Sequence, residues 1–180
     1  MGIEVKMDIF DDKLKITAIR LDDRLLHGII VTQWLPQIKC NRVIIVDDKV
    51  ANDALKKEVM QLSKPLNVAL SIINKTTFKN NMENNRYDHQ KLYIITRDIS
   101  ILPLLVCFQY SLPKINVGMY FAKNGTYALS NRIVVNDSDL LIMKELMELG
   151  IIFEAQYVPS ESAENLNVVI KEQMKEENHG

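Results

Sequence analysis

Short apolar runs alternate with helix-like segments along most of the chain, and this alternation restricts the possible fold more than any other feature. Residues 42–46 (RVIIV) and 92–95 (LYII) are typical of strands that are buried on both faces. Each run is followed by a longer segment with helical features. Strands that alternate with helices in this way predict a mostly parallel sheet with helices on both faces. We therefore expect an α/β, doubly wound fold.

The expected elements follow this rhythm along the chain. The expected strands are residues 14–20, 42–46, 68–73, 92–95, 115–118, 132–135 and 152–158. The expected helices are residues 29–38, 51–62, 77–84, 99–108 and 138–149, with a last helix that begins near Ser162. A chain of 180 residues fits a single domain. We assign residues 14–180 to this domain and residues 1–13 to a flexible N-terminal extension.

Composition and terminal sequence exclude several classes of protein. The 22 basic and 23 acidic residues almost balance, which argues against nucleic acid as a partner, because such binding needs an excess of Lys and Arg. The longest nearly apolar stretch, residues 99–108, is shorter than the roughly 20 residues that span a bilayer. The N-terminus has no signal-peptide pattern, so we expect a cytoplasmic protein. Cys40 and Cys107 lack metal-ligand spacing and are predicted to be buried free thiols.

The densest group of reactive side chains follows the first expected strand, in residues 20–28 (RLDDRLLHG). Ligands of doubly wound sheets bind at the carboxyl ends of the strands, where this loop lies. The imidazole of His27 can act as a nucleophile near neutral pH, with one ring nitrogen attacking and the other held by a hydrogen bond. Arg24 offers a planar fork for two phosphate oxygens, and Gly28 permits close approach to the backbone. The start of the next helix also favours an anion.

Several of these side chains also have a purely structural interpretation. Asp22 and Asp23 either orient Arg24 or the imidazole, or cap a solvated turn. His27 is either a nucleophile or a satisfied core histidine. Thr96, at the end of the fourth expected strand, either reaches the phosphate or serves as a turn residue before the next helix. The sequence alone leaves these alternatives open.

A longer comparison of motifs points to a known family. Residues 19–28 (IRLDDRLLHG), followed by residues 31–34 (VTQW), closely resemble the active-site segment of the enzyme IIB subunits of the mannose/fructose/sorbose phosphotransferase system (PTS). Residues 41–48 (NRVIIVDD) are similar to the next strand of that family, and residues 115–119 (INVGM) to its Asn-Val-Gly-Gly segment. The resemblance extends from residue 15 to residue 166, which is nearly the whole domain.

This resemblance implies a cytoplasmic phosphocarrier that associates peripherally with a membrane permease. It implies that His27 accepts a phosphoryl group from a phosphohistidine of enzyme IIA and passes it to a sugar bound by the membrane subunits, enzymes IIC and IID. The implied activity is that of a protein-Nπ-phosphohistidine–sugar phosphotransferase, with His27, Arg24 and Asp23 as catalytic residues. Combined with the chemistry of the loop, it leads us to expect Arg24, Gly28 and Thr96 as phosphate contacts. Neither a metal nor another cofactor is expected.

Some features remain open even within this family. Ile29 replaces a glutamine that is common in the family and Met119 replaces the second glycine, and the effect of these changes near the site is open. The resemblance implies that the membrane subunits recognise the sugar, so the sequence does not name it. Trp34 either contacts a partner or packs in the core, and a homodimer is compatible with the sequence. A non-enzymatic regulatory or binding module with the same fold is the main alternative. A nucleotide-binding enzyme is disfavoured, because the first loop contains neither GxGxxG nor GxxxxGK[ST].

Overall fold

A computed structural model of the chain describes residues 14–108 and 110–177. Within these ranges the predicted α/β fold is confirmed, since a mostly parallel central sheet carries helices on both faces. The extension predicted for residues 1–13 lies outside the described residues. None of the helices in the described ranges is both long and apolar enough to cross a membrane.

The strand order of the sheet is β3-β2-β4-β1-β5-β7-β6, with β8 beside β5 and β9 beside β8. The pairs β6–β7 and β8–β9 are antiparallel, and the others are parallel. Because β1 lies between β4 and β5, the loop that follows β1 leaves the sheet near the middle of its carboxyl edge. The strands are β1 (Lys15–Asp22), β2 (Arg42–Val46), β3 (Ala69–Ile73), β4 (Lys91–Thr96), β5 (Ile115–Phe121), β6 (Tyr127–Ser130), β7 (Ile133–Val135), β8 (Phe153–Ala155) and β9 (Glu164–Asn165).

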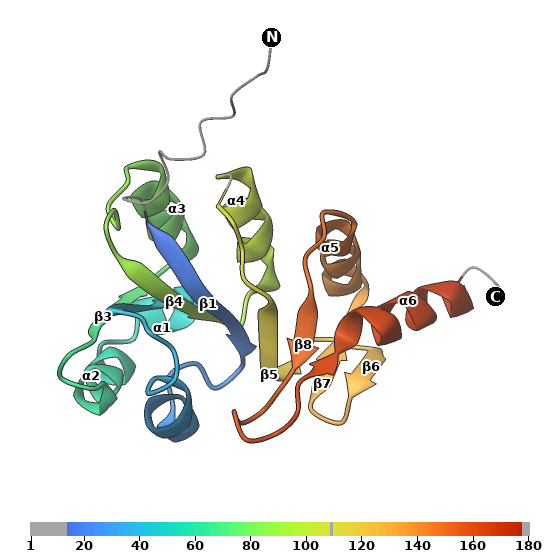
Figure 1. Cartoon of the computed structure of the whole chain (residues 1–180), viewed down its shortest axis with the longest axis horizontal. Coiled ribbons are helices and arrows are strands. Elements are labelled where there is room, and N and C mark those ends of the chain that lie inside the picture. The colour runs from blue at the N-terminus through green and yellow to red at the C-terminus, as the bar shows by residue number, and fades with distance from the viewer. Residues whose placement is uncertain (1–13, 109, 178–180) are drawn as a thin grey trace, which may run out of the picture.

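Helices cover the two faces of the sheet unequally. Figure 1 shows α3, α4 and α5 on one side of the sheet and α2 on the other. The first side also receives α6, and the second side receives the short helices η1 and α1. The helices are η1 (Ile30–Trp34), α1 (Asp48–Ala51), α2 (Ala54–Ser63), α3 (Lys75–Glu83), η2 (Ile99–Ile101), α4 (Leu102–Cys107), α5 (Asp137–Glu148) and α6 (Leu166–Glu177).

The sheet separates two hydrophobic cores. Side chains alternate between the faces of a strand, so in β2 the side chain of Ile44 packs in the larger core and that of Ile45 in the smaller core. The smaller core also holds Leu25, Leu26 and Ile30. The loop after β1 is therefore anchored to the body of the domain by apolar side chains.

Several element boundaries differ from the prediction. The first strand continues to Asp22, and the helix expected at residues 51–62 is split into α1 and α2, because Asp53 caps a new helix by accepting the N–H of Lys56. The strand expected at residues 152–158 ends at Ala155. The last helix begins at Leu166 instead of near Ser162, and β6 was not expected.

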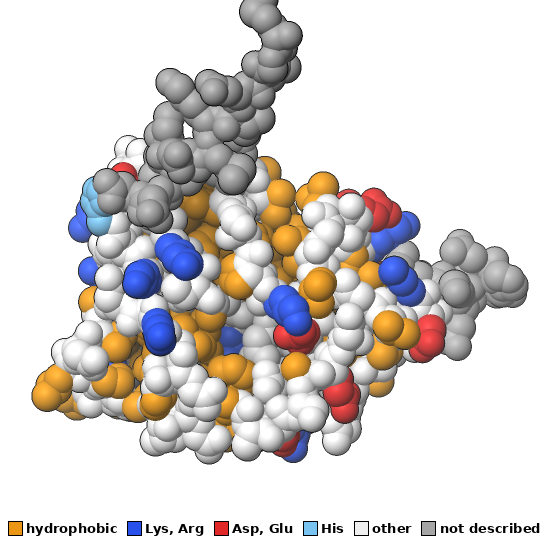
Figure 2. Space-filling model, in the orientation of Figure 1, with side chains coloured by type: hydrophobic (Ala, Val, Ile, Leu, Met, Phe, Trp, Pro, Cys, Tyr) orange, Lys and Arg blue, Asp and Glu red, His pale blue; other side chains and the backbone are white. Residues whose placement is uncertain are grey.

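Two surface features complete the fold. Helix α2 exposes Leu55, Val59 and Leu62, which accounts for the apolar surface over α2 in Figure 2.

Both cysteines are free thiols, as predicted. Their predicted burial is wrong, since Cys40 is only half-buried and Cys107 is exposed.

Candidate active site

The loop between β1 and η1 makes a sharp turn that two buried leucines hold in place. Leu25 and Leu26 lie in the smaller core, and the N–H of Leu25 donates to the carbonyl of Asp22 at 3.0 Å. Leu25 has a φ of 57°, in the left-handed region that non-glycine residues rarely adopt. Strained backbone of this kind persists only where the surrounding structure holds it, and it occurs often at functional sites. The turn brings Arg24 and His27 back to Asp22 at the end of β1.

Asp22 is the centre of this arrangement and is fully buried. Its carboxylate accepts hydrogen bonds from Nε and Nη2 of Arg20 at 3.0 and 2.9 Å, and from Nε and Nη2 of Arg24 at 3.0 and 2.9 Å. Nε2 of His27 lies 3.4 Å from Oδ2 of the same carboxylate. Burial alone would raise the pKa of Asp22, but the hydrogen bonds from His27 and Arg24 and the charge of Arg20 outweigh it. The pKa of Asp22 therefore lies well below its usual range.

Arg20 is a fully buried cation whose donors are all engaged. A guanidinium group carries five N–H donors. Those of Arg20 bond to Asp22, the side-chain oxygen of Asn116, and the carbonyls of Gln156 and Tyr157. A group with no free donor and no exposure cannot bind a ligand, so Arg20 holds Asp22 in place.

Unlike Arg20, Arg24 is partly exposed and has N–H donors that are not hydrogen-bonded to any described residue. Its side chain is 27% exposed, and its guanidinium makes three hydrogen bonds, two to Asp22 and one from Nη1 to the hydroxyl of Tyr157 at 2.7 Å. Two of its five N–H donors are therefore free within the described part of the chain. Two charged N–H donors at a partly exposed position suit the oxygens of a phosphate.

His27 presents one ring nitrogen to Asp22 and is 18% exposed. An ionised carboxylate can only accept hydrogen bonds, so the Nε2 that faces it carries the proton. In a neutral ring this leaves the lone pair on Nδ1, and a nitrogen with a free lone pair is chemically able to act as a nucleophile. The same carboxylate thus fixes the tautomer of His27 and the orientation of Arg24.

The C-terminal part of the domain closes the site through Tyr157. Its carbonyl accepts from Nε1 of Trp34 and from Nη2 of Arg20, each at 3.1 Å. Its ring lies 4.6 Å from the Cζ of Arg24 and 4.1 Å from the Cζ of Arg132. Trp34 itself lies against this site, with the Cζ of Arg20 4.9 Å from its ring. Sequence reasoning missed Tyr157 and Arg132, because Tyr157 lies 133 positions beyond Arg24.

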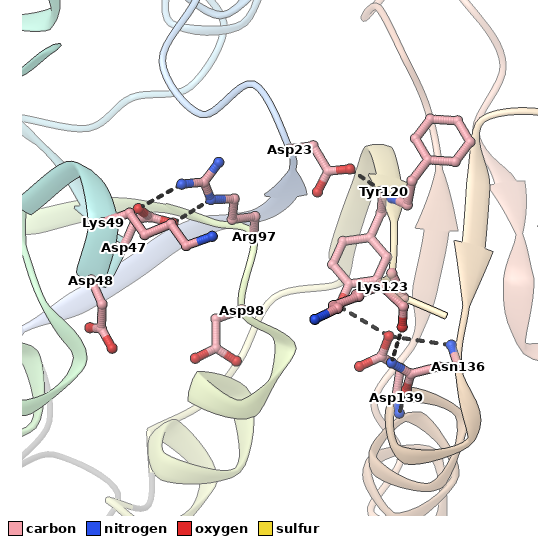
Figure 3. A pocket seen from close by; sticks show the side chains of 12 residues that line it. Asp23, Asp47, Asp48, Lys49, Arg97, Asp98, Tyr120, Lys123, Asn136 and Asp139 are labelled. Carbon is pink, nitrogen blue, oxygen red and sulfur yellow. Dashed lines mark hydrogen bonds and ion pairs between the residues drawn. The ribbon is translucent and has the colours of Figure 1, made fainter. Parts of the chain in front are cut away.

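Asp23 is directed away from the network around Asp22. Its Oδ2 accepts the N–H of Phe121 at 2.7 Å, and it lines a cavity of about 550 Å³ at the carboxyl edge of the sheet (Figure 3). Burial raises the pKa of Asp23. The structure therefore joins His27 and Arg24 through Asp22, and it places Asp23 beside a separate cavity.

This cavity has an acidic lining. Five aspartates and three basic side chains surround it, and Arg97 is paired with Asp47, with 2.9 Å between Nη2 and Oδ1. An excess of carboxylates is a poor environment for a phosphate, since like charges repel. The free N–H donors of Arg24 make the loop after β1 the better anion site.

The two remaining predicted phosphate contacts lie in different environments. Thr96 is fully buried, and its hydroxyl donates to the carbonyl of Val46 at 2.8 Å and accepts the N–H of Asp98 at 2.9 Å. The first bond ties the end of β4 to the end of β2, and the second holds the turn after β4. Neither bond brings Thr96 into the group around Asp22. Gly28 follows His27 and is exposed, and a Cβ added there would meet nothing within 4 Å. The space beside His27 is open to an approaching group.

Comparison with known proteins places these residues in context. Residues 16–180 match the family model of the PTS system sorbose subfamily IIB component. The chain is 29% identical to the N-acetylgalactosamine-specific phosphotransferase enzyme IIB component 1 of Escherichia coli (strain K12), over 84% of the chain and 96% of that protein. It is 25% identical to the PTS system mannose-specific EIIAB component of the same strain, over 84% of the chain and 47% of that protein. The crystal structure of the IIBSor domain of the sorbose permease from Klebsiella pneumoniae has the same fold, with a TM-score of 0.78 at 23% identity, over 88% of the chain and 97% of that domain.

Proposed function

The chain belongs to the sorbose subfamily of PTS IIB components, which take part in sugar phosphotransfer, and we propose that it carries the phosphoryl group on Nδ1 of His27. The observation that carries this proposal is that His27 and Arg24 share the buried carboxylate of Asp22, with Nδ1 and two guanidinium N–H groups left for a ligand. No other described histidine has such surroundings, since His89 is exposed and makes no contact with this network.

The first step of the proposed reaction is an in-line transfer to His27. The Nδ1 lone pair attacks the phosphorus of a phosphohistidine on enzyme IIA, and the bond between phosphorus and the donor ring breaks as the new P–N bond forms. Positive charge develops on the ring of His27, and Asp22 stabilises it through the proton on Nε2. The two free N–H groups of Arg24 and the backbone N–H of Gly28 bind the phosphoryl oxygens.

The second step passes the phosphoryl group to a sugar. A sugar hydroxyl attacks the phosphorus and gives its proton to water. The electron pair of the breaking P–Nδ1 bond returns to Nδ1, which leaves His27 neutral with its proton on Nε2. We assign the sugar to membrane subunits of the IIC and IID type, with this chain on the cytoplasmic side. Asp23 connects the loop after β1 to β5 by accepting the N–H of Phe121. Thr96 stabilises the turn after β4.

The mannose-specific relative supports the choice of donor. Its name, EIIAB, indicates a IIA and a IIB component in one protein, and the chain matches about half of its length. A IIA component and a IIB component that belong to one polypeptide must work close to each other. We therefore propose a phosphorylated IIA component as the donor to this chain.

The proposal is tested by phosphorylation in vitro. The purified chain is incubated with phosphoenolpyruvate, the general PTS proteins and a matching IIA component, and its mass is measured before and after mild acid. We expect one acid-labile adduct of about 80 Da, the mass of a phosphoryl group. The adduct should disappear in His27→Asn and persist in the matched control His89→Asn. A wild-type chain without the adduct, or an adduct that survives in His27→Asn, would contradict the proposal.

A further inference from the structure

We infer that Tyr157 is a positioning residue that fixes the guanidinium of Arg24 for phosphoryl transfer. This inference rests on the proposed function, because it concerns the residue that would bind the transferred group. Tyr157 contacts both arginines of the site, Arg24 through its hydroxyl and ring and Arg20 through its carbonyl. Apart from Asp22 at the end of β1, no other residue in the described ranges makes a hydrogen bond to the side chain of Arg24.

The hydroxyl of Tyr157 supplies a restraint that Asp22 cannot supply. Asp22 engages Nε and Nη2, which lie along one edge of the guanidinium of Arg24. A group held along one edge can still tilt about that edge, and this side chain is partly exposed to water. The bond from Nη1 to the hydroxyl of Tyr157 adds a third point, so the plane of the guanidinium is fixed. The two free N–H groups then point in a constant direction.

Tyr157 is itself held in position from several sides. Its ring contacts the guanidinium groups of both Arg24 and Arg132. Its backbone N–H donates to Oε2 of Glu161 at 3.4 Å. Arg132 also pairs with Glu161 at 3.5 Å. With its carbonyl held by Trp34, the residue is restrained at the N–H, the carbonyl and the ring. A phenol restrained in this way can transmit its position to Arg24.

The test removes only the hydroxyl, with Tyr157→Phe. We expect the rate constant for phosphorylation at saturating phospho-IIA to fall about tenfold, the effect of losing one hydrogen bond to a charged group. The donor concentration for half-maximal rate should stay unchanged. Tyr87→Phe is a matched control, because the ring of Tyr87 lies 5.8 Å from the Cζ of Arg42 and its hydroxyl accepts from Asn81 at 2.8 Å. The control should keep the wild-type rate within about twofold.

A double-mutant comparison shows whether Tyr157 acts through Arg24. In an Arg24→Lys background, Tyr157→Phe should cause no further loss of rate, since the group that it positions is gone. A second loss of similar size would overturn the inference.

A spectroscopic measurement decides the same question without relying on transfer. The ¹H–¹⁵N signal of Nε of Arg24, assigned by its absence in Arg24→Lys, should shift and broaden in Tyr157→Phe and stay in place in Tyr87→Phe. An unchanged signal in Tyr157→Phe would overturn the inference even if transfer is observed. If the wild-type chain accepts no phosphoryl group, the proposed function fails, while the signal still reports whether Tyr157 positions Arg24.

Discussion

Gly118 of β5 lies so close to Arg20 that no larger residue fits without moving the guanidinium. A Cβ added to Gly118 would lie 1.8 Å from Nη2 of Arg20 and 2.6 Å from Oδ2 of Asp22. Both atoms belong to buried side chains whose positions are fixed by hydrogen bonds to each other. The Asp22 network therefore depends on bare backbone in the neighbouring strand.

Gly118→Ala should destabilise the domain and disturb the site together. Because the added methyl group displaces Arg20, we expect a loss of roughly 1–3 kcal/mol in the free energy of unfolding, with slower phosphorylation. Urea unfolding, followed by the fluorescence of Trp34, measures the first effect. Gly28→Ala is the control for stability, because a Cβ there meets nothing within 4 Å. Equal loss of stability in the two variants would contradict the prediction.

Asp22→Asn should be strongly destabilising near neutral pH. Removing this charge leaves the buried guanidinium of Arg20 without its partner, which typically costs about 3–5 kcal/mol. The pKa of Asp22 is lower in the folded chain than in the unfolded chain, so its charge contributes stability above the unfolded pKa of about 3.9. That contribution is lost as the pH falls toward the folded pKa. Urea unfolding at neutral and acid pH should show the wild-type advantage shrinking below about pH 4.

Asp23→Asn should change the free energy of unfolding in the opposite direction to Asp22→Asn, although the two aspartates are adjacent. Burial raises the pKa of Asp23 in the folded chain, so ionisation above the unfolded pKa of about 3.9 costs the wild type stability. An asparagine avoids this cost and its oxygen can still accept the N–H of Phe121. We expect the variant to be at least as stable as the wild type near neutral pH, with the two curves converging in acid. A variant less stable than the wild type at neutral pH would refute this assignment.

Substitution of the two arginines by lysine should separate structure from transfer. Arg24→Lys keeps the charge but loses the planar fork, so phosphorylation should slow by about 100-fold while the free energy of unfolding changes by about 1 kcal/mol or less. Arg20→Lys replaces five N–H donors by three, so at least two of the buried hydrogen bonds are lost, and this should cost roughly 2–5 kcal/mol of stability. Urea midpoints and initial rates measured on both variants check this contrast. Similar effects of the two substitutions on both quantities would contradict it.

Much of the fold was predictable because its strands have strong local patterns. Residues 42–46 were predicted without error, since a continuous β-branched run has few other interpretations. The loop after β1 was predictable as a candidate site, because parallel sheets direct their ligands to the carboxyl edge. Irregular turns, however, cannot be predicted from local sequence patterns. The strand expected at residues 152–158 ends at Ala155, because the carbonyl of the next residue, Gln156, turns to accept a hydrogen bond from Arg20.

The partners within the site were harder to predict than its location. The first strand was predicted to end at Arg20, but β1 continues to Asp22. Side chains two positions apart lie on the same face of a strand, so the correct strand end would have placed Arg20 and Asp22 on one face. That spacing alone would have paired Arg20 with Asp22 and set Asp23 apart. Tyr157 had no local signal, because its contacts with Arg24 depend on how the end of the sheet folds back.

All five N–H donors of Arg20 are already hydrogen-bonded within the domain, so Arg20 has none left for a phosphoryl group. The two arginines and Asp22 carry a single net positive charge, whereas a phosphoryl group at neutral pH carries about two negative charges. In the proposed intermediate Arg24 is the one of these two arginines with N–H groups left for the phosphoryl oxygens, so the charge of the phosphoryl group is only partly compensated. Under the proposed function, this incomplete compensation would keep the phosphoryl group easy to transfer, as a carrier that passes the group on requires.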